Sequence, residues 1–136
     1  MLTTHQPVTA ICASDGIEIW SANGGDGVPS AAIWDGRVYV YSHYLQCLDL
    51  KTGASVYGER VPDIKGRVYA SLLAADGKIY LTTSESGVIV LEAGPGFKVL
   101  AHNRIAGDQS KFNASPAVSG NQVYFRSDKA LYCVGE

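Results

Sequence analysis

Three similar segments occur along the chain and are the main indication of its fold: SAAIWDGRVYV at residues 30–40, SLLAADGKIYL at 71–81 and SPAVSGNQVYF at 115–125. In each copy a tyrosine follows the first serine by nine residues. These tyrosines, Tyr39, Tyr80 and Tyr124, are 41 and 44 residues apart. A period of this length is typical of four-stranded sheets repeated around a common axis, so we expect a repeat architecture.

Each copy begins with a predicted hairpin. Asp35-Gly36 and Asp76-Gly77 are strong turn signals, because glycine adopts a positive φ without steric cost and aspartate tolerates the neighbouring turn position. The third copy has a looser turn, Ser-Gly-Asn at 119–121. The segments after the turns are rich in β-branched and aromatic residues. We expect strands at 38–41, 45–50, 55–61, 79–83, 88–92, 97–105, 123–127 and 130–134, and an upstream pair at 8–13 and 17–22.

These patterns predict an all-β protein made of β-propeller blades, which are four-stranded antiparallel sheets, with about three blades in the chain. No stretch shows an apolar stripe of helical period, so helix should be minimal. The small residues of Ser30-Ala31-Ala32 suit the crowded centre of a propeller, although chance in a sequence rich in serine and alanine is an alternative. We expect one partial propeller domain over residues 1–136, divided into orphan outer strands (8–23), two blades (28–66 and 67–109) and an incomplete blade (110–136).

The turn after the third strand of the first copy reads CLDLKTGASVY at residues 47–57. It resembles the repeat of the pyrroloquinoline-quinone-type propellers, Ala-x-Asp-x-x-Thr-Gly-x-x-x-Trp, in which the tryptophan docks one blade on the next. An aspartate can accept turn N–H bonds, a glycine can supply a left-handed residue, and an aromatic ring can cover an adjacent sheet. We assign blade docking to Trp20, Asp49, Thr52, Gly53 and Tyr57.

Composition excludes several classes of function. The net charge of −2 and the pI near 5.9, without a run of more than two basic residues, argue against nucleic acid as a partner. No apolar run approaches the length of a membrane-spanning helix, and residues 1–6 lack the features of a signal peptide. The family resemblance implies a bacterial periplasmic or secreted protein, whereas the chain as written, if complete, would be cytoplasmic. The compartment stays open.

The resemblance also implies a test for redox chemistry. In the dehydrogenases of this family, a quinone lies over a tryptophan beside an adjacent Cys-Cys disulfide, with calcium held by Glu, Asn and Asp. This sequence has no Cys-Cys pair, and Trp34 directly precedes an Asp-Gly turn. We therefore expect no cofactor and no metal. Cys12, Cys47 and Cys133 fall in different blades, so we expect them to be unpaired.

Catalytic patterns are weak as well. There are three histidines and no nucleophile elbow, and the glycines of residues 24–27 lack the lysine of a phosphate-binding loop. Propeller geometry would place a site where the loops between second and third strands meet the connections between blades. Each polar residue there is ordinarily a solvated loop charge. As a set, the candidates are Asp26, His43, Asp63, Arg67, Asp108, Lys111, Arg126 and Asp128.

Two classes of function remain. The first is a non-catalytic module that binds protein or carbohydrate or serves in an assembly. The second is an enzyme, a hydrolase or quinone-dependent oxidoreductase, whose site forms at the channel mouth of an assembled ring. About three blades would leave bare edges, so we expect a homo-oligomer, a dimer being favoured, in which residues 17–22 supply an outer strand to the partner. The alternative is a piece of a longer propeller.

Overall fold

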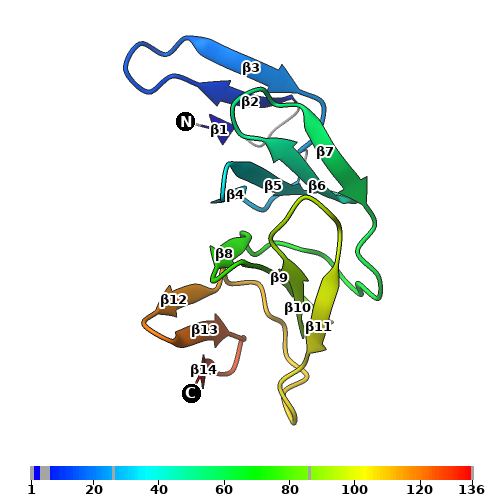
Figure 1. Cartoon of the computed structure of the whole chain (residues 1–136). Coiled ribbons are helices and arrows are strands. Elements are labelled where there is room, and N and C mark those ends of the chain that lie inside the picture. Colours follow the sequence, from blue (N-terminus) through cyan, green and yellow to red (C-terminus); the bar gives the residue numbers. More distant parts are fainter. Residues whose placement is uncertain (1, 4–6, 26, 86, 136) are drawn as a thin grey trace.

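Four antiparallel sheets follow one another along the chain (Figure 1). The computed structural model describes residues 2–3, 7–25, 27–85 and 87–135, and these residues form strands, turns and irregular segments without helix. The all-β prediction is therefore confirmed for the described part of the chain. We number the sheets in chain order; sheet 1 lies at one end of the array and sheet 4 at the other, with sheets 2 and 3 between them.

Sheets 2 and 3 have four strands each, and sheets 1 and 4 have three. Sheet 1 contains β1 (Leu2–Thr3), β2 (Val8–Ile11) and β3 (Glu18–Ala22). Sheet 2 contains β4 (Ala32–Trp34), β5 (Arg37–Tyr41), β6 (Leu45–Asp49) and β7 (Ser55–Glu59). Sheet 3 contains β8 (Leu73–Ala75), β9 (Lys78–Thr83), β10 (Gly87–Glu92) and β11 (Val99–Asn103). Sheet 4 contains β12 (Ala117–Ser119), β13 (Gln122–Arg126) and β14 (Leu131–Gly135).

The N-terminal sheet differs from the predicted pair of orphan strands. Residues 2–3 form β1, which pairs with β2 through Leu2 opposite Ala10 and Thr3 opposite Thr9. A two-residue strand carries no alternating pattern, so sequence periodicity had no signal for it. Because β2 pairs with both β1 and β3, residues 18–22 of the predicted strand 17–22 belong to a three-stranded sheet of their own chain and are not a solitary outer strand.

The predicted hairpin turns form as the sequence indicates. Asp35 and Gly36 have φ of 45° and 70°, and Asp76 and Gly77 have φ of 48° and 67°. Two successive positive φ values match the twist of flanking strands in a two-residue hairpin. The outer strands are shorter than expected, since β7 ends at Glu59 and β11 begins at Val99.

The core lies between successive sheets. Between sheets 2 and 3, the buried side chains include Tyr39, Leu45 and Cys47 on one side and Ile79 and Leu91 on the other. Smaller clusters join sheet 1 to sheet 2 and sheet 3 to sheet 4. Both faces of sheets 2 and 3 are therefore buried, so each of these sheets needs two neighbours.

The repeated serine links the inner ends of three sheets. The backbone N–H of Ser30 donates to the hydroxyl of Ser71 at 3.2 Å, and the N–H of Ser71 donates to the hydroxyl of Ser115 at 2.9 Å. Each of these serines stands nine residues before the tyrosine of its copy, so the three serines occupy equivalent positions in neighbouring sheets. We call this chain of bonds the serine ladder.

The repeat turns join the outer parts of the sheets. Asp49 accepts bonds from the Lys51 and Thr52 N–H groups at 3.0 and 2.9 Å and from the Thr52 hydroxyl at 2.8 Å. Trp20 donates from Nε1 to the Leu50 carbonyl at 2.9 Å. A Cβ on Gly53 would approach Trp20 Cε3 to 2.6 Å, and Gly53 has a φ of +71°. This close approach explains why the turn has glycine where the indole packs.

A second aromatic contact repeats this arrangement one sheet further along. Tyr57 of β7 meets Phe97, which precedes β11, with ring centroids 6.0 Å apart and the planes at 76°. An aromatic side chain of an outer strand therefore contacts the next sheet both between sheets 1 and 2 and between sheets 2 and 3. The three cysteines, Cys12, Cys47 and Cys133, are free thiols.

Candidate binding site at the loop end

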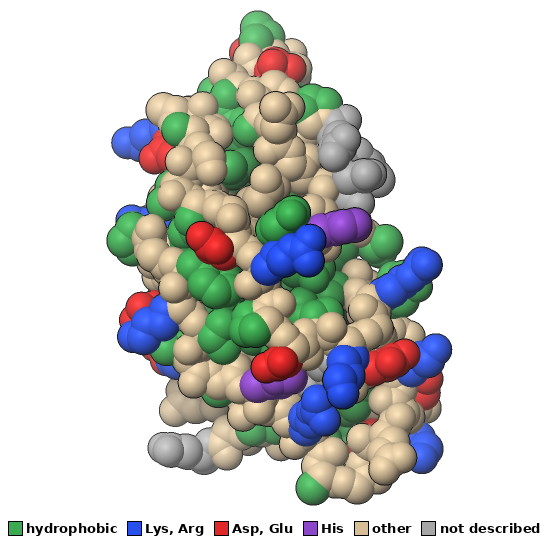
Figure 2. Space-filling model, turned by 90° about the vertical axis from the view of Figure 1, so that its right-hand side faces the viewer, with side chains coloured by type: hydrophobic (Ala, Val, Ile, Leu, Met, Phe, Trp, Pro, Cys, Tyr) green, Lys and Arg blue, Asp and Glu red, His purple; other side chains and the backbone are tan. Residues whose placement is uncertain are grey.

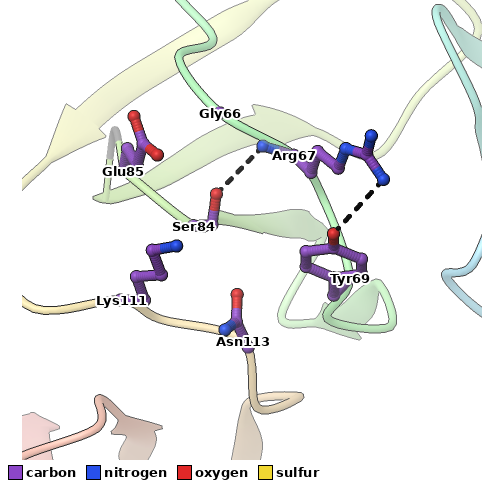
Figure 3. Close-up of a pocket in the computed structure, with 7 residues that line it drawn as sticks. All are labelled: Gly66, Arg67, Tyr69, Ser84, Glu85, Lys111 and Asn113. Carbon is purple, nitrogen blue, oxygen red and sulfur yellow. Dashed lines mark hydrogen bonds between the residues drawn. The ribbon is translucent and has the colours of Figure 1, made fainter.

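A pocket opens where the loops of sheet 3 meet the connections on either side of it. Its volume is about 670 Å³. The turn between β9 and β10 contributes two residues, and the connections into sheets 3 and 4 contribute the rest (Figure 3). We call it the central pocket, and it is lined by Gly66, Arg67, Tyr69, Ser84, Glu85, Lys111 and Asn113.

Ser84 holds the walls of the central pocket together. Its hydroxyl accepts from the Arg67 N–H at 2.9 Å, and its own N–H donates to the Arg67 carbonyl at 2.9 Å. Its carbonyl accepts from the Phe112 N–H at 3.3 Å. The side chain is buried. Ser84 is therefore committed to fixing the two connections that carry the cationic side chains.

Two cations border the central pocket. The Arg67 guanidinium donates to the Tyr69 hydroxyl at 3.5 Å, and Lys111 extends its ammonium group toward the side of Ser84 (Figure 3). Among the described residues, no ion pair joins Glu85 to either cation. The pocket therefore presents two basic side chains next to the hydroxyl of Tyr69 and the amide of Asn113, which can both form hydrogen bonds.

A second pocket of about 640 Å³ adjoins the first and shares Gly66, Arg67 and Tyr69 with it. It extends toward sheet 2, where His43 and Arg60 line it. The Arg60 guanidinium lies 5.2 Å from the centre of the Tyr44 ring. Together the two pockets form a groove across sheets 2 and 3, which we call the loop groove. The face shown in Figure 2 carries acidic and basic side chains side by side rather than a field of one sign.

The candidate residues from the sequence fall into separate places. Arg67 and Lys111 line the central pocket, and His43 shares the second pocket with Arg67. Arg126 and Asp128 line a third pocket of about 290 Å³ that also includes Asn113 of the central pocket. Asn113 therefore lies between this third pocket and the central pocket.

The other candidates stand apart. Asp26 lies outside the described residues. Asp63 is exposed in a turn with a φ of 58° and lines neither the loop groove nor the third pocket. Asp108 is engaged within the chain. The loop groove therefore contains only part of the predicted set.

Asp108 connects the segment before sheet 4 to sheet 4 itself. Its carboxylate accepts from the Ser110 hydroxyl and N–H, from the Ser127 hydroxyl at 2.6 Å and from the Tyr132 hydroxyl at 2.6 Å. The Ser110 hydroxyl is the main cause of a pKa for Asp108 well below its usual range, and Ser127 and Tyr132 add to it. Phe112 stacks on Tyr132 with centroids 6.1 Å apart. Both carboxylate oxygens of Asp108 therefore accept hydrogen bonds from within the chain.

Sequence reasoning missed Tyr69, Ser84, Glu85 and Asn113 as pocket residues. A signal for Ser84 was present, because Ser42, Ser84 and Ser127 each directly follow the second strand of a sheet. This repeat position marks the loop where neighbouring connections meet. Tyr69 and Asn113 carry no repeat signal, so only the folded chain identifies them.

The residues present do not fit a quinone site of the dehydrogenase type. Trp34 packs against the core between sheets 2 and 3, and Trp20 covers Gly53 while donating to Leu50. Both indoles are therefore engaged in sheet packing and neither forms the floor of a pocket. Among the described residues, no three His, Cys, Asp or Glu side chains come together as a metal ligand set. In the same part of the chain, no helix has the length and apolar character needed to cross a membrane.

The stacked sheets, the serine ladder and the repeat turns define a partial β-propeller with pyrroloquinoline-quinone-type repeats. The family model described as outer membrane protein assembly factor BamB matches residues 4–134, and the chain belongs to this family. No curated protein matches the sequence.

Solved structures show the same fold. BamB from Moraxella catarrhalis is 21% identical with a TM-score of 0.71, over 98% of this chain and 45% of that chain. The computationally designed Ika4 protein is 10% identical with a TM-score of 0.71, over 98% of this chain and 82% of that chain. Quinohemoprotein alcohol dehydrogenase ADHIIG from Pseudomonas putida HK5 is 19% identical with a TM-score of 0.68, over 90% and 26%. The chain thus spans less than half the length of the BamB structure.

Proposed function

We propose that this chain is a non-catalytic binding or scaffold module, assembles as an oligomer, and binds an acidic segment of a partner protein in the loop groove. The observation that carries the proposal is that Arg67 and Lys111 line the same pocket. Among the described residues, no carboxylate forms an ion pair with either of them. The family description, an outer membrane protein assembly factor, supports a protein ligand.

The chemistry of the groove favours binding over reaction. Its most buried polar side chain, Ser84, is already bonded to the Arg67 backbone. The exposed groups, Arg67 and Lys111, are cations that pair with carboxylates, and arginine does so with two parallel hydrogen bonds. Tyr69 adds an aromatic surface beside them, and Asn113 adds an amide. Such a surface suits Asp or Glu side chains on an extended polypeptide.

Titration with defined probes tests this proposal. We expect a peptide of alternating Glu and Gly to bind, and the double variant Arg67→Ser with Lys111→Ser to bind it at least about tenfold more weakly, with affinity falling as salt rises. The matched control is Lys51→Ser with Lys98→Ser, which removes two cations that line none of the described pockets. Equal affinity of all three proteins, or no binding of the peptide, contradicts the proposal. Preferential binding of cellohexaose would change the ligand class to carbohydrate.

The alternative function, an enzyme with a site at the channel mouth, is tested with the same proteins. The likeness to quinoprotein dehydrogenases shows the fold alone, because the identity is 19%. Dye-linked oxidation of an alcohol after addition of quinone and calcium would replace the binding proposal. So would ester hydrolysis that is lost in the Arg67→Ser, Lys111→Ser double variant and kept in the control.

A further inference from the structure

On the face of sheet 2 that packs on sheet 3, three residues from adjacent strands lie directly opposite one another and form a row across the sheet. Ala32 lies opposite Tyr39, and Tyr39 lies opposite Cys47. Residues directly opposite each other in an antiparallel pair project to the same face. Tyr39 and Cys47 are 0% exposed, because sheet 3 covers them. The row Ala-Tyr-Cys is thus an interior row in sheet 2.

Sheet 4 carries the same three residue types at the same register positions. Ala117 lies opposite Tyr124, and Tyr124 lies opposite Cys133. Leu131, opposite Arg126 on this face, is 68% exposed. Ala117 and Cys133 are exposed as well, and no described segment covers them. Among the described residues, the row that is buried in sheet 2 is therefore left without cover in sheet 4.

Sheet 1 has an uncovered face at the other end of the array. Trp20 points to sheet 2, so its neighbours Ile19 and Ser21 project to the opposite side. Ile19 is 60% exposed, and Ile17, just before the strand, is 65% exposed. Thr9 lies opposite Ser21, and their hydroxyls are 3.3 Å apart. This face presents isoleucine, threonine and serine side chains to solvent.

The contacts between successive sheets within the chain indicate what kind of surface packs on each of these two exposed faces. Tyr39 of sheet 2 packs on sheet 3, and the equivalent Tyr80 of sheet 3 meets Phe125 of sheet 4 with centroids 6.5 Å apart. Both of these steps are head to tail, because the tyrosine row of one sheet meets the face of the next sheet that lacks the tyrosine row. The next step after sheet 4 is a sheet that offers its non-tyrosine face, as sheet 1 does.

We infer that the tyrosine row of sheet 4 in one copy of this chain stacks on the outer face of sheet 1 in a second copy, and the reverse, to close a two-fold ring. This inference rests on the oligomer included in the proposed function and specifies the surfaces through which the oligomer forms. The chain matches 45% of the BamB structure while using 98% of its own length, so two copies span almost one such structure. A head-to-tail contact that closes after two copies gives a discrete dimer, whereas one that does not close gives filaments.

The contact is made by faces rather than by exchange of a strand. β3 is already bonded to β2, and β2 to β1, so the N-terminal strand pairs within its own sheet. Stacking keeps all these bonds and covers Ala117, Tyr124, Leu131 and Cys133 with the side chains of Ile17 and Ile19. Burial of these apolar side chains stabilises the contact.

Two single variants and their mixture test the inference. In wild-type protein, light scattering should give twice the chain mass of 14.5 kDa. Leu131→Glu and Ile19→Lys each place a charge in the contact, so each should weaken dimerisation by at least about tenfold. An equimolar mixture of the two variants should dimerise again, because one contact is then wild-type and the other joins Glu to Lys. Val56→Glu is the matched control, since Val56 is 40% exposed on β7 of sheet 2.

Several results would overturn the inference. A monomer at all concentrations refutes it, as do filaments of growing mass. A dimer that Leu131→Glu disrupts but Ile19→Lys leaves intact would mean that sheet 4 stacks on sheet 4. Circular dichroism of each variant checks that the strands are retained. Binding of the Glu-Gly peptide by the Leu131→Glu monomer would show that the loop groove works without the contact, so the two proposals fail independently.

Discussion

At the scale of single residues, polar side chains here are mainly used to hold loops in place. Asp49 closes the repeat turn with three hydrogen bonds, and Asp108 attaches a connection to sheet 4. Both carboxyls have a pKa below the usual value, chiefly because a neighbouring hydroxyl donates to the charged form: Thr52 for Asp49 and Ser110 for Asp108. A charged side chain in a propeller loop can therefore be a packing element rather than a ligand group.

We predict that Asp108→Asn destabilises the protein at neutral pH and that this effect shrinks as the pH falls below the usual range of an aspartate pKa. The folded state holds the pKa of Asp108 below its unfolded value, so the carboxylate contributes stability above the unfolded pKa, and that contribution is lost as the pH falls through the folded one. The difference between the melting temperatures of wild type and variant should shrink progressively from about pH 5 to about pH 1. The control is Asp63→Asn, an exposed aspartate, for which the two melts should nearly coincide throughout.

We predict a graded loss of stability at Trp20. Trp20→Phe keeps an aromatic face over Gly53 but loses the bond to the Leu50 carbonyl, which costs about 1 kcal/mol. Trp20→Ala removes a buried ring between sheets 1 and 2, which costs about 3–5 kcal/mol. Urea denaturation measures both. Equal stability of the two variants would mean that the indole does not carry the docking of sheet 1.

At the scale of elements, the alternation of the repeat and its turns predicted most strands. The hairpins at Asp35-Gly36 and Asp76-Gly77 could be predicted because local backbone preference decides them. β1 and the shorter extents of β7 and β11 could not be predicted, because contacts with neighbouring segments decide where pairing stops. The candidate site was predictable only as a region. Arg67 and Lys111 could be named as loop cations, but Tyr69 and Asn113 join them through the packing of two distant connections.

We predict that the serine ladder contributes measurably to the contact between sheets 2, 3 and 4. Ser71→Ala leaves the Ser30 N–H without its acceptor, and the free energy of unfolding should fall by about 0.5–1.5 kcal/mol. Ser119→Ala is the control, because Ser119 is an exposed residue at the end of β12, and its effect should stay within about 0.5 kcal/mol. Urea titration of both variants decides it. A loss in Ser119→Ala as large as in Ser71→Ala would contradict a special role of the ladder.

At the scale of the whole molecule, the two end sheets each have one face that no described segment of the chain covers. Sheets 2 and 3 have neighbours on both faces, while sheets 1 and 4 each have one. A dimer that covers both ends makes the melting temperature rise with protein concentration. We predict this rise for the wild type and for Val56→Glu, and a constant melting temperature for Leu131→Glu. Differential scanning calorimetry over a hundredfold range of concentration measures it, and a wild-type melting temperature that does not change would argue against the dimer.

The all-β class, the repeat and its hairpins can be derived from the sequence alone, because they follow from local backbone preference and from a period that every copy shares. Tertiary structure alone decided which side chains share a pocket and which carboxylates are used for packing. The Ser127 and Tyr132 hydroxyls reach Asp108 only after sheet 4 has packed on the connection before it. The physical reason is that a hydrogen bond between distant residues needs both chain segments to be placed first, and burial between sheets places them.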